Sequence, residues 1–277
     1  IAPWAANLVS PVAKLAAGVH PKRELPRFAS RRERARVRAG DPAERDGAPK
    51  DVVLWVDTFN EAFYPRTIVA AREVLERAGY AVQLSEPGLC CGRPLYEYGF
   101  LGLARKLLLR NLDVLPADVP IVGLEPSCVS VFRDELPNLL SGDERAAPLS
   151  KRVMTLSEFV MREKMPLPQL EASALLQIHC HQRSVLDGGA ELALLRTMGA
   201  EVSVPEQGCC GMAGAFGFEN EKYEVSMRIG ERSLLPAVRR SSERTLIVAD
   251  GFSCREQIVQ KSGRRAVHLA EVLSAEY

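Results

Sequence analysis

The chain repeats one pattern twice, and this repeat constrains the fold more than any other feature of the sequence. Residues 121–128 (IVGLEPSC) align without gaps with residues 247–254 (IVADGFSC), and four of the eight residues are identical. Residues 153–159 align in the same way with residues 266–272. Two copies of one structural unit are therefore predicted.

Each copy alternates short apolar runs with amphipathic segments. Residues 52–56 (VVLWV) form an apolar run of the kind found in strands that are buried on both faces of a parallel sheet. Pro65 and Gly79 suit the start and the C-terminal cap of a helix, and a second strand is predicted over residues 80–84. Strands joined by helices imply right-handed βαβ crossovers. We therefore expect an α/β fold of two tandem, pseudo-repeated, Rossmann-like βα domains with parallel sheets, over residues 51–165 and 172–277.

The first 50 residues do not share this pattern. Residues 20–50 are basic and show little apolar periodicity, so we expect residues 1–50 to form a connector or a peripheral wrap. The charged run at residues 31–38 is expected to be a solvated surface. The sequence begins at Ile1, which we interpret as the start of a fragment of a longer protein.

Composition narrows the choice of partners. The 36 Lys and Arg residues nearly balance the 35 Asp and Glu residues, which leaves a net charge of +1. No global field would draw such a chain to nucleic acid or to an anionic membrane. The sequence also has no apolar run of the length that a transmembrane helix needs.

The cysteine count is the one unusual number. An odd number of cysteines cannot pair completely, and adjacent cysteines rarely meet the geometry of a mutual disulfide. A reduced compartment and a metal or redox use are therefore predicted. The seven cysteines are Cys90, Cys91, Cys128, Cys180, Cys209, Cys210 and Cys254.

Every cysteine follows a predicted strand, and we expect all seven to lie in loops rather than within helices or strands. In open parallel sheets, ligands bind beyond the carboxyl ends of the strands, where several loops converge. The second copy should bring four thiols together there, and the first copy three. Thr58 stands at the position that matches Cys180.

Thiolates that converge in this way suit zinc or an iron–sulfur cluster, since both take soft ligands. Structural zinc sites usually contain C-x2-C knuckles, and this chain has none. Adjacent cysteines are strained around one ion but can reach different irons of a cluster. Buried structural cysteine is a further alternative, because free cysteine is often buried.

Residues 207–217 (QGCCGMAGAFG) resemble the CCG cysteine-rich domain. This domain occurs in duplicate in one of the subunits of heterodisulfide reductase and in the iron–sulfur subunits of anaerobic glycerol-3-phosphate dehydrogenase, glycolate oxidase and lactate utilisation systems. Residues 52–60, 90–96, 124–128 and 250–257 resemble the C-terminal part of longer oxidoreductases. Those proteins carry an FAD-linked oxidase domain and ferredoxin-type cluster motifs before two CCG domains. The resemblance covers residues from about 50 to 277.

The resemblance implies oxidation of a 2-hydroxy acid, such as D-lactate, D-2-hydroxyglutarate or glycolate, at a flavin. This chain would then be the electron-transfer portion, with at least one [4Fe-4S] cluster. FAD and the ferredoxin-type clusters would lie elsewhere on a longer chain or on a partner subunit. The acceptor would be a quinone or a cytochrome, and the location cytoplasmic or at the inner face of the membrane. The alternatives are a zinc-binding docking domain and a disulfide-type reductase at an open-site cluster.

The chain departs from the family pattern in both copies. The full pattern ends in a C-x2-C pair, which is reduced here to Cys128 and to Cys254, and Thr58 replaces the lead cysteine of the first copy. We therefore expect the cluster in the second copy. The first copy would hold a weaker or different centre, zinc among the candidates, or none.

Other polar residues near the cysteines are candidates for supporting roles. The two histidines could ligate a metal, relay a proton or bond a cluster sulfur, or they could be structural. The aspartate could supply a hard ligand or cap a loop, and the arginines could balance an anionic cluster or bind a carboxylate. These candidates are His179, His181, Asp57, Arg93, Arg183 and Arg255. No residue is assigned to substrate oxidation.

Overall fold

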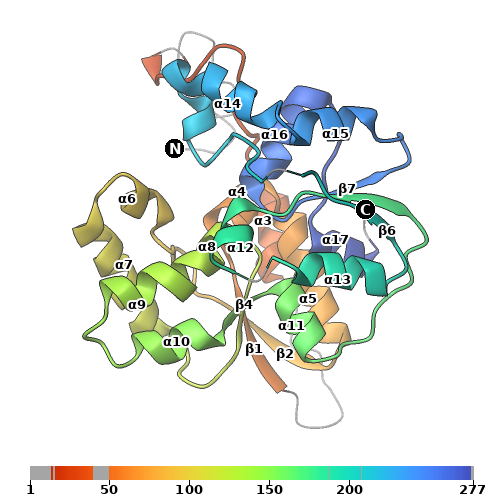
Figure 1. Ribbon diagram of the computed structural model, residues 1–277. Coiled ribbons are helices and arrows are strands. Elements are labelled where there is room, and N and C mark those ends of the chain that lie inside the picture. The colour runs from red at the N-terminus through yellow and green to blue at the C-terminus, as the bar shows by residue number, and fades with distance from the viewer. Residues whose placement is uncertain (1–13, 15, 40–49, 187, 207, 276–277) are drawn as a thin grey trace.

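The structure is a computed structural model that describes residues 14, 16–39, 50–186, 188–206 and 208–275 (Figure 1). Two parallel sheets form its frame, with strand orders β2-β1-β3-β4 and β6-β5-β7. The expected α/β fold with parallel sheets is confirmed. The strands are β1 (Lys50–Trp55), β2 (Tyr80–Leu84), β3 (Ile121–Gly123), β4 (Val153–Thr155), β5 (Ser173–Leu176), β6 (Glu201–Ser203) and β7 (Leu246–Val248).

Corresponding strands pair in the same order in the two sheets. The first strand of each copy is central, since β1 lies between β2 and β3 and β5 lies between β6 and β7. Val267 forms an isolated parallel bridge with Val248, at the place that β4 takes in the first sheet. The bridge lies where the alignment of residues 153–159 with residues 266–272 places a fourth strand.

Both faces of each sheet are covered, as parallel sheets require. Successive strand residues point to opposite faces, so Val52 and Leu54 enter one apolar core while Val53 and Trp55 enter another. The first of these, the central core, also receives residues of the second sheet. Five of the described helices contribute to the central core: α3 (Arg31–Arg38), α5 (Pro65–Arg77), α11 (Leu156–Arg162), α13 (Ala190–Thr197) and α17 (Leu269–Ser274).

A separate apolar core covers the outer face of each sheet. The outer core of the first sheet contains Cys91 and Cys128, and that of the second contains Cys210 and Cys254. The helices around the first sheet are α4 (Thr58–Phe63), α6 (Arg93–Glu97), α7 (Leu101–Val114), α8 (Pro126–Ser130), α9 (Leu136–Leu139) and α10 (Ala146–Arg152), with a π turn at Val131–Glu135. Those around the second are α12 (Cys180–Ser184), α14 (Tyr223–Gly230), α15 (Leu234–Arg240) and α16 (Phe252–Ser262), with 3-10 turns at Phe216–Phe218 and Asn220–Lys222.

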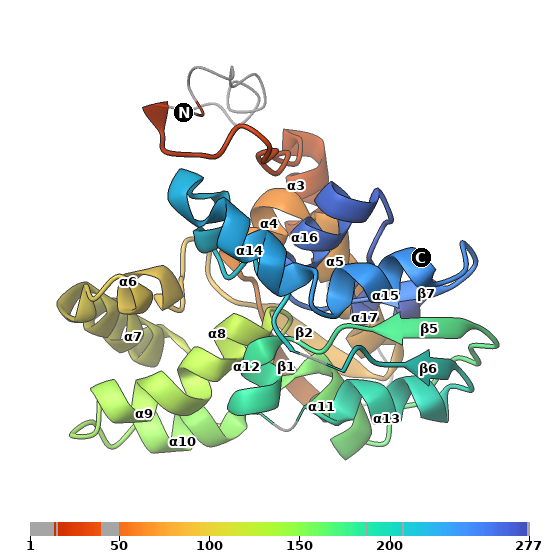
Figure 2. The same ribbon diagram turned by 45° about the horizontal axis from the view of Figure 1, so that its top comes forward.

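The two copies interlock across the central core. Helix α5 packs on α17, and α11 packs on α13. Because α5 corresponds to α13 and α11 to α17 in the repeat, each of these helices packs on a helix of the other copy. Helices α8 and α12, again from different copies, lie side by side in Figures 1 and 2. The division into domains at residues 165 and 172 stays a prediction, since the central core takes residues from both sides of it.

The described part of the connector packs on both copies. Helix α3 (Arg31–Arg38) begins at a capping box of Ser30 and Glu33 and packs on α5. Most of this charged run is exposed, as expected, although Val37 is buried. Arg23 is 0% exposed, which the interpretation as a peripheral wrap did not anticipate. Residues 1–13 and 40–49 of the connector lie outside the described residues. None of the described helices is long and apolar enough to span a membrane.

Candidate metal centre

The seven cysteines gather into two groups of free thiols. In the first thiol group, Cys91 Sγ lies 3.1 Å from Cys128 Sγ, and Cys90 is hydrogen-bonded to Cys91. In the second thiol group the sulfurs form a row in which each is hydrogen-bonded to the next: Cys180, Cys209, Cys210 and Cys254. The structure therefore places three thiols together in one copy and four in the other.

The two groups lie at the carboxyl ends of the strands, but three of the cysteines are helical. Cys128 and Cys254 lie in the first turns of α8 and α16, and Cys180 is the first residue of α12. The expectation that no cysteine lies in a helix was wrong for these three, because each helix begins within a few residues of its strand. Their thiols are consequently positioned by strand-to-helix junctions.

Thr58 takes the fourth position of the first thiol group. It is the first residue of α4, as Cys180 is the first residue of α12. Thr58 is hydrogen-bonded to Cys90, and Cys180 is hydrogen-bonded to Cys209. The position is thus present in both copies, but only the second has a thiol there.

The backbone of each Cys-Cys-Gly turn donates to sulfur. The Gly92 N–H donates to Cys90 Sγ at 3.4 Å, and the Gly211 N–H donates to Cys209 Sγ at 3.3 Å. Both glycines have left-handed backbones, with φ of 85° and 87°. At Gly211 a Cβ atom would also lie 2.2 Å from the carbonyl oxygen of Ser226. Hydrogen bonds of this kind stabilise negative charge on sulfur.

The thiols of the two groups differ in acidity. Hydrogen bonds from the thiols of Cys180 and Cys210 lower the pKa of Cys209 to about 2. In the first thiol group, the hydrogen bond to Cys91 and burial raise the pKa of Cys90 above its usual range. The same row of hydrogen bonds raises the pKa of Cys180 and of Cys210, so it favours Cys209 as the thiolate of the second thiol group.

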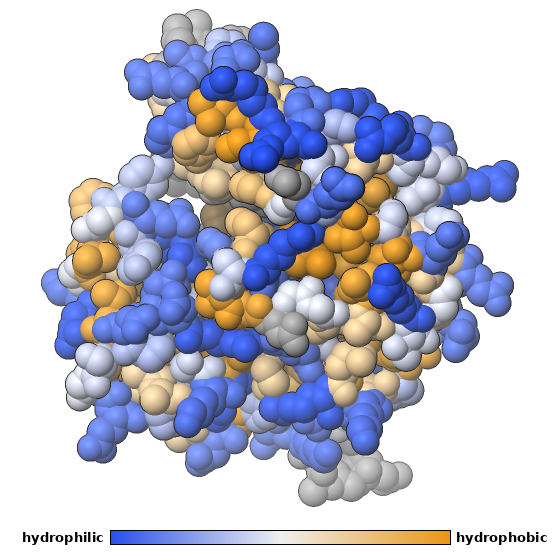
Figure 3. Space-filling view, viewed as in Figure 1, coloured by the Kyte–Doolittle hydropathy of each residue, from blue (hydrophilic) through white to orange (hydrophobic). Residues whose placement is uncertain are grey.

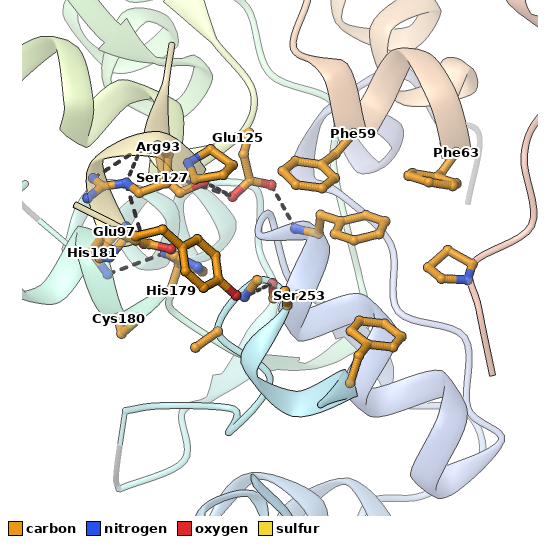
Figure 4. Close-up of a pocket in the computed structure, with 18 of the residues that line it drawn as sticks. Phe59, Phe63, Arg93, Glu97, Glu125, Ser127, His179, Cys180, His181 and Ser253 are labelled. Carbon is orange, nitrogen blue, oxygen red and sulfur yellow. Dashed lines mark hydrogen bonds and ion pairs between the residues drawn. The ribbon is translucent and has the colours of Figure 1, made fainter. Parts of the chain in front are cut away.

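A cavity of about 310 Å³ lies between the two copies, beside the second thiol group. Phe59 and Phe252 stack in its wall with ring centroids 4.7 Å apart, and Cys180 is the one thiol among its described lining residues. Arg93, Glu97 and the two histidines supply polar atoms on one side (Figure 4). Figure 3 shows a hollow in the surface between the part of the molecule that contains α6 and α7 and the part that contains α14.

A smaller cavity of about 100 Å³ adjoins the first thiol group. Its lining includes Trp55 and Thr58 as well as the three thiols. The two cavities share four lining residues, so only a thin wall separates one cavity from the other. The shared residues are Phe59, Arg93, Pro94 and Ser127.

The two histidines lie at the start of α12 and face the larger cavity. His179 caps this helix, because its Nδ1 accepts the His181 N–H at 3.3 Å. His181 Nδ1 lies 3.3 Å from Ser130 Oγ of the other copy. Burial lowers the pKa of each imidazole to about 4. Both rings are therefore neutral at pH 7, and a role as ligand or proton relay stays a prediction.

Asp57 caps α4 rather than pointing into open space. Its Oδ1 accepts the Asn60 N–H at 2.9 Å, and its Oδ2 accepts from the Asn60 side chain at 2.7 Å. Burial, together with the nearby Glu125 carboxylate, raises the pKa of Asp57 to about 6. The geometry accounts for Asp57 as a capping residue, one of the two roles considered from the sequence.

The three candidate arginines have different surroundings. Arg93 lines both cavities, pairs with Glu135 and donates to the Ser127 carbonyl. Arg255 is buried and donates to the Asp250 carbonyl at 2.7 Å and to Asn60 Oδ1 at 2.7 Å. Arg183 donates to the Pro205 carbonyl at 3.3 Å. Among the three, Arg93 alone borders both cavities.

Within the described ranges, no three Cys, His, Asp or Glu side chains surround a point that could hold one metal ion. The sulfurs form rows instead. The choice of cofactor therefore depends on the chemical type of the ligands in each thiol group, because the side chains do not already surround a metal position.

Some residues of the site were not predicted from the sequence. Glu125 lies in the aligned motif, but it bonds the backbone of Phe252 in the other copy, which no local pattern indicates. Phe59 and Trp55 lie in the quoted segments without any sign that they border cavities. Gly92 and Gly211 could have been predicted as site residues, because the repeat aligns each of them directly after a pair of cysteines.

Comparison with known proteins identifies the repeated unit. Residues 56–133 and 183–258 match the model of the CCG cysteine-rich domain, and together they make up more than half of the chain. The chain belongs to the CCG cysteine-rich domain family. The first match includes Thr58 and all thiols of the first group, while Cys180 lies just before the second match.

Three similar proteins show how much of a longer relative the chain covers. The chain is 29% identical over 242 residues to D-2-hydroxyglutarate dehydrogenase of Pseudomonas putida, covering 84% of this chain but 23% of that protein. It is 30% identical over 215 residues to a subunit of the anaerobic glycerol-3-phosphate dehydrogenase of Escherichia coli, covering 73% and 53%. It is 27% identical over 241 residues to lactate utilization protein A of Bacillus subtilis, covering 81% and 99%. The chain thus spans about a quarter of the first relative and about half of the second.

Proposed function

We propose that this chain is the iron–sulfur electron-transfer module of a flavin-dependent dehydrogenase that oxidises a 2-hydroxy acid of the D-lactate, D-2-hydroxyglutarate or glycolate class. The observation that carries the proposal is the convergence of four thiols at the edge of the second sheet. The names of the relatives support a dehydrogenase context.

The residues at this edge suit a [4Fe-4S] cluster. Cys180, Cys209, Cys210 and Cys254 would hold it, since thiolates are the usual ligands of such clusters. Two backbone N–H groups already face these sulfurs, from Gly211 at 3.3 Å and from Met212 at 3.4 Å. When bound, the cluster would accept and release single electrons, and N–H donors of this kind raise its reduction potential.

The chain's own residues would exclude water from this centre and hold it in one orientation. Cys210 and Cys254 lie within the apolar core of the second copy, with 3% and 1% of their surface exposed. Cys180 faces the cavity and is the point nearest to an incoming molecule. FAD would be held by another part of a longer chain or by a partner subunit, and a quinone or a cytochrome would take the electrons.

Metal analysis under anaerobic conditions tests the proposal. Protein purified without oxygen should be brown, contain iron and acid-labile sulfide, and give an electron paramagnetic resonance signal on reduction. Cys209→Ser should remove most of the iron, whereas the matched Cys90→Ser change in the first group should remove less. Colourless protein that contains about one zinc and no iron would instead support a zinc-stabilised docking domain.

Disulfide reduction at the module itself is a second candidate, because the larger cavity gives a small molecule access to the second thiol group. In that reaction one S–S bond of the substrate would break, with two electrons from the module and two protons from solvent forming two thiols. Cys180 is the thiol to replace, because Cys254 is buried away from the cavity. Retained iron with loss of disulfide turnover in Cys180→Ser would support this activity.

A further inference from the structure

Arg23 is a fully buried cation whose partners in the described part of the chain include no carboxylate. Its guanidinium donates to three neutral oxygen acceptors: the Gly217 carbonyl at 2.6 Å, Gln257 Oε1 at 2.7 Å and Ser226 Oγ at 2.7 Å. It also lies 5.0 Å from the centroid of the Tyr223 ring. Among the described residues, no acidic side chain forms an ion pair with it.

The three acceptors belong to the segments that build the second thiol group. Gly217 ends the glycine-rich loop that follows Cys210. Ser226 lies on α14, and its carbonyl group packs directly against Gly211 of the Cys-Cys-Gly turn. Gln257 lies on α16, about one turn beyond Cys254. Arg23 therefore joins the loop and both helices around the second thiol group.

The connector reaches this position by packing along the second copy. The His20 ring stacks on the Tyr223 ring with centroids 3.9 Å apart, and the His20 N–H donates to the Phe218 carbonyl at 2.8 Å. In Figures 1 and 2 the N-terminal segment runs beside α14. A residue that precedes the first copy in the sequence is thus built into the second.

A buried guanidinium without a counter-charge is costly, and a neutral hydrogen-bond set offsets only part of that cost. Burial lowers the pKa of Arg23, whereas Tyr223 and Cys210 act in the opposite direction. An arginine keeps its proton in proteins, so the charge remains. Cys210 belongs to the second thiol group, so negative charge on that group acts on Arg23.

We propose that Arg23 balances the negative charge of the second centre and favours its reduced form. This inference rests on the proposed function, because it assumes that the thiols hold an iron–sulfur cluster. Reduction adds one electron, from the flavin side of the enzyme, and no bond or proton changes at Arg23. A fixed positive charge nearby stabilises the additional negative charge and so raises the reduction potential.

Redox titration of the second centre tests this role. Arg23→Gln removes the charge and keeps a polar side chain, and the exposed Arg27→Gln is the matched control from the same segment. The titration should follow the paramagnetic signal that Cys209→Ser abolishes. At a fixed applied potential, the ratio of reduced to oxidised centre should fall several-fold in Arg23→Gln and stay unchanged in Arg27→Gln. An unchanged ratio in an iron-loaded Arg23→Gln protein would overturn the proposal.

Arg23→Lys separates charge from structure. It keeps the charge but loses the forked hydrogen bonds, so it should unfold at a lower temperature and still titrate close to the wild type. A strongly lowered reduction potential in Arg23→Lys would mean that the hydrogen bonds matter rather than the charge, and this result would overturn the proposal. Because Arg23→Lys is measured independently, it tests the proposal even if Arg23→Gln fails to fold. Absence of iron from the wild-type protein itself would instead contradict the proposed function.

Discussion

The backbone N–H of Phe252 donates to Glu125 Oε2 at 2.8 Å, from one copy of the repeat to the other (Figure 4). The other carboxylate oxygen, Oε1, accepts from the Ser127 hydroxyl at 2.8 Å and from the Ser127 N–H at 3.3 Å. Ser127 directly precedes Cys128, and Phe252 lies two residues before Cys254. One buried carboxylate therefore fixes the strand-to-helix junctions of both thiol groups.

Replacing Glu125 by Gln should weaken both junctions. The amide has one acceptor oxygen, so its NH2 group must face either the Phe252 N–H or the Ser127 donors. We expect the free energy of unfolding to fall by about 1–3 kcal/mol, the usual cost of leaving a buried donor unpaired. Urea denaturation measures the change, and the exposed Glu144→Gln is the control. Equal stability of the two variants would contradict this account of Glu125.

Exchanging the residues at positions 58 and 180 should reverse the difference in iron binding between the two thiol groups. Thr58→Cys gives the first group a fourth soft ligand, so iron and acid-labile sulfide per chain should rise after anaerobic reconstitution. Cys180→Thr leaves the second group with three thiols, so both contents should fall. If neither variant changes the iron content, this position does not take part in binding.

The two Cys-Cys-Gly turns should tolerate alanine unequally. At Gly211 an added Cβ would lie 2.2 Å from the Ser226 carbonyl oxygen, whereas at Gly92 the nearest atom, Ala104 Cα, would lie 3.6 Å away. Both substitutions place alanine in the left-handed region, which costs about 1–2 kcal/mol. Gly92→Ala should lose about that amount in chemical denaturation, and Gly211→Ala clearly more. Similar losses for both would show that the contact with Ser226 relaxes freely.

Stability should depend on pH through Glu191. Burial, with a smaller effect of Asp250, raises the pKa of Glu191 to about 7 from the ordinary value of 4.5. Between these values the folded state binds the proton and the unfolded state does not. The stabilisation is therefore complete below about pH 4.5 and is lost as the pH rises through 7, a change of about 3 kcal/mol.

Glu191→Gln should flatten that dependence. Its side-chain oxygen can still accept from Ser157 Oγ, which lies 2.7 Å from Glu191 Oε1. The wild-type slope also contains Asp57, whose raised pKa acts in the same direction, and His179 and His181, whose lowered pKa values act in the opposite direction. The difference between the slopes of the variant and the wild type is therefore the contribution of Glu191. Urea midpoints measured from pH 5 to pH 8 provide the comparison. If stability changes with pH equally in Glu191→Gln and in the wild type, the proton is bound by a group other than Glu191.

Much of the architecture followed from the repeat and from the rule that ligand loops gather at the ends of parallel strands. That rule brought the thiols into two groups, and the alignment placed Thr58 in the position that Cys180 holds. Contacts between the copies could not be predicted in this way. The bond from Phe252 to Glu125 joins segments far apart in the sequence, and each looks ordinary within its own copy.

Local patterns also misjudged two kinds of residue. Cys128 and Cys254 were expected in loops, yet helices begin so soon after the strands that both lie in a first helical turn. Arg23 lies in a basic segment without apolar periodicity, which indicates an exposed position. Its burial depends on a pocket formed by Gly217, Ser226 and Gln257, all about 200 residues later in the chain.

The crossed packing of α5 on α17 and of α11 on α13 also describes how such a molecule can arise. A chain with a single copy would leave the inner faces of its helices bare. Two such chains could cover these faces around a two-fold axis, because the same pair of helices would meet on both sides. The present chain holds both halves of such an arrangement in one polypeptide. Identical subunits must carry identical residues, so a threonine at one of these positions and a cysteine at the other require that both copies lie on one chain.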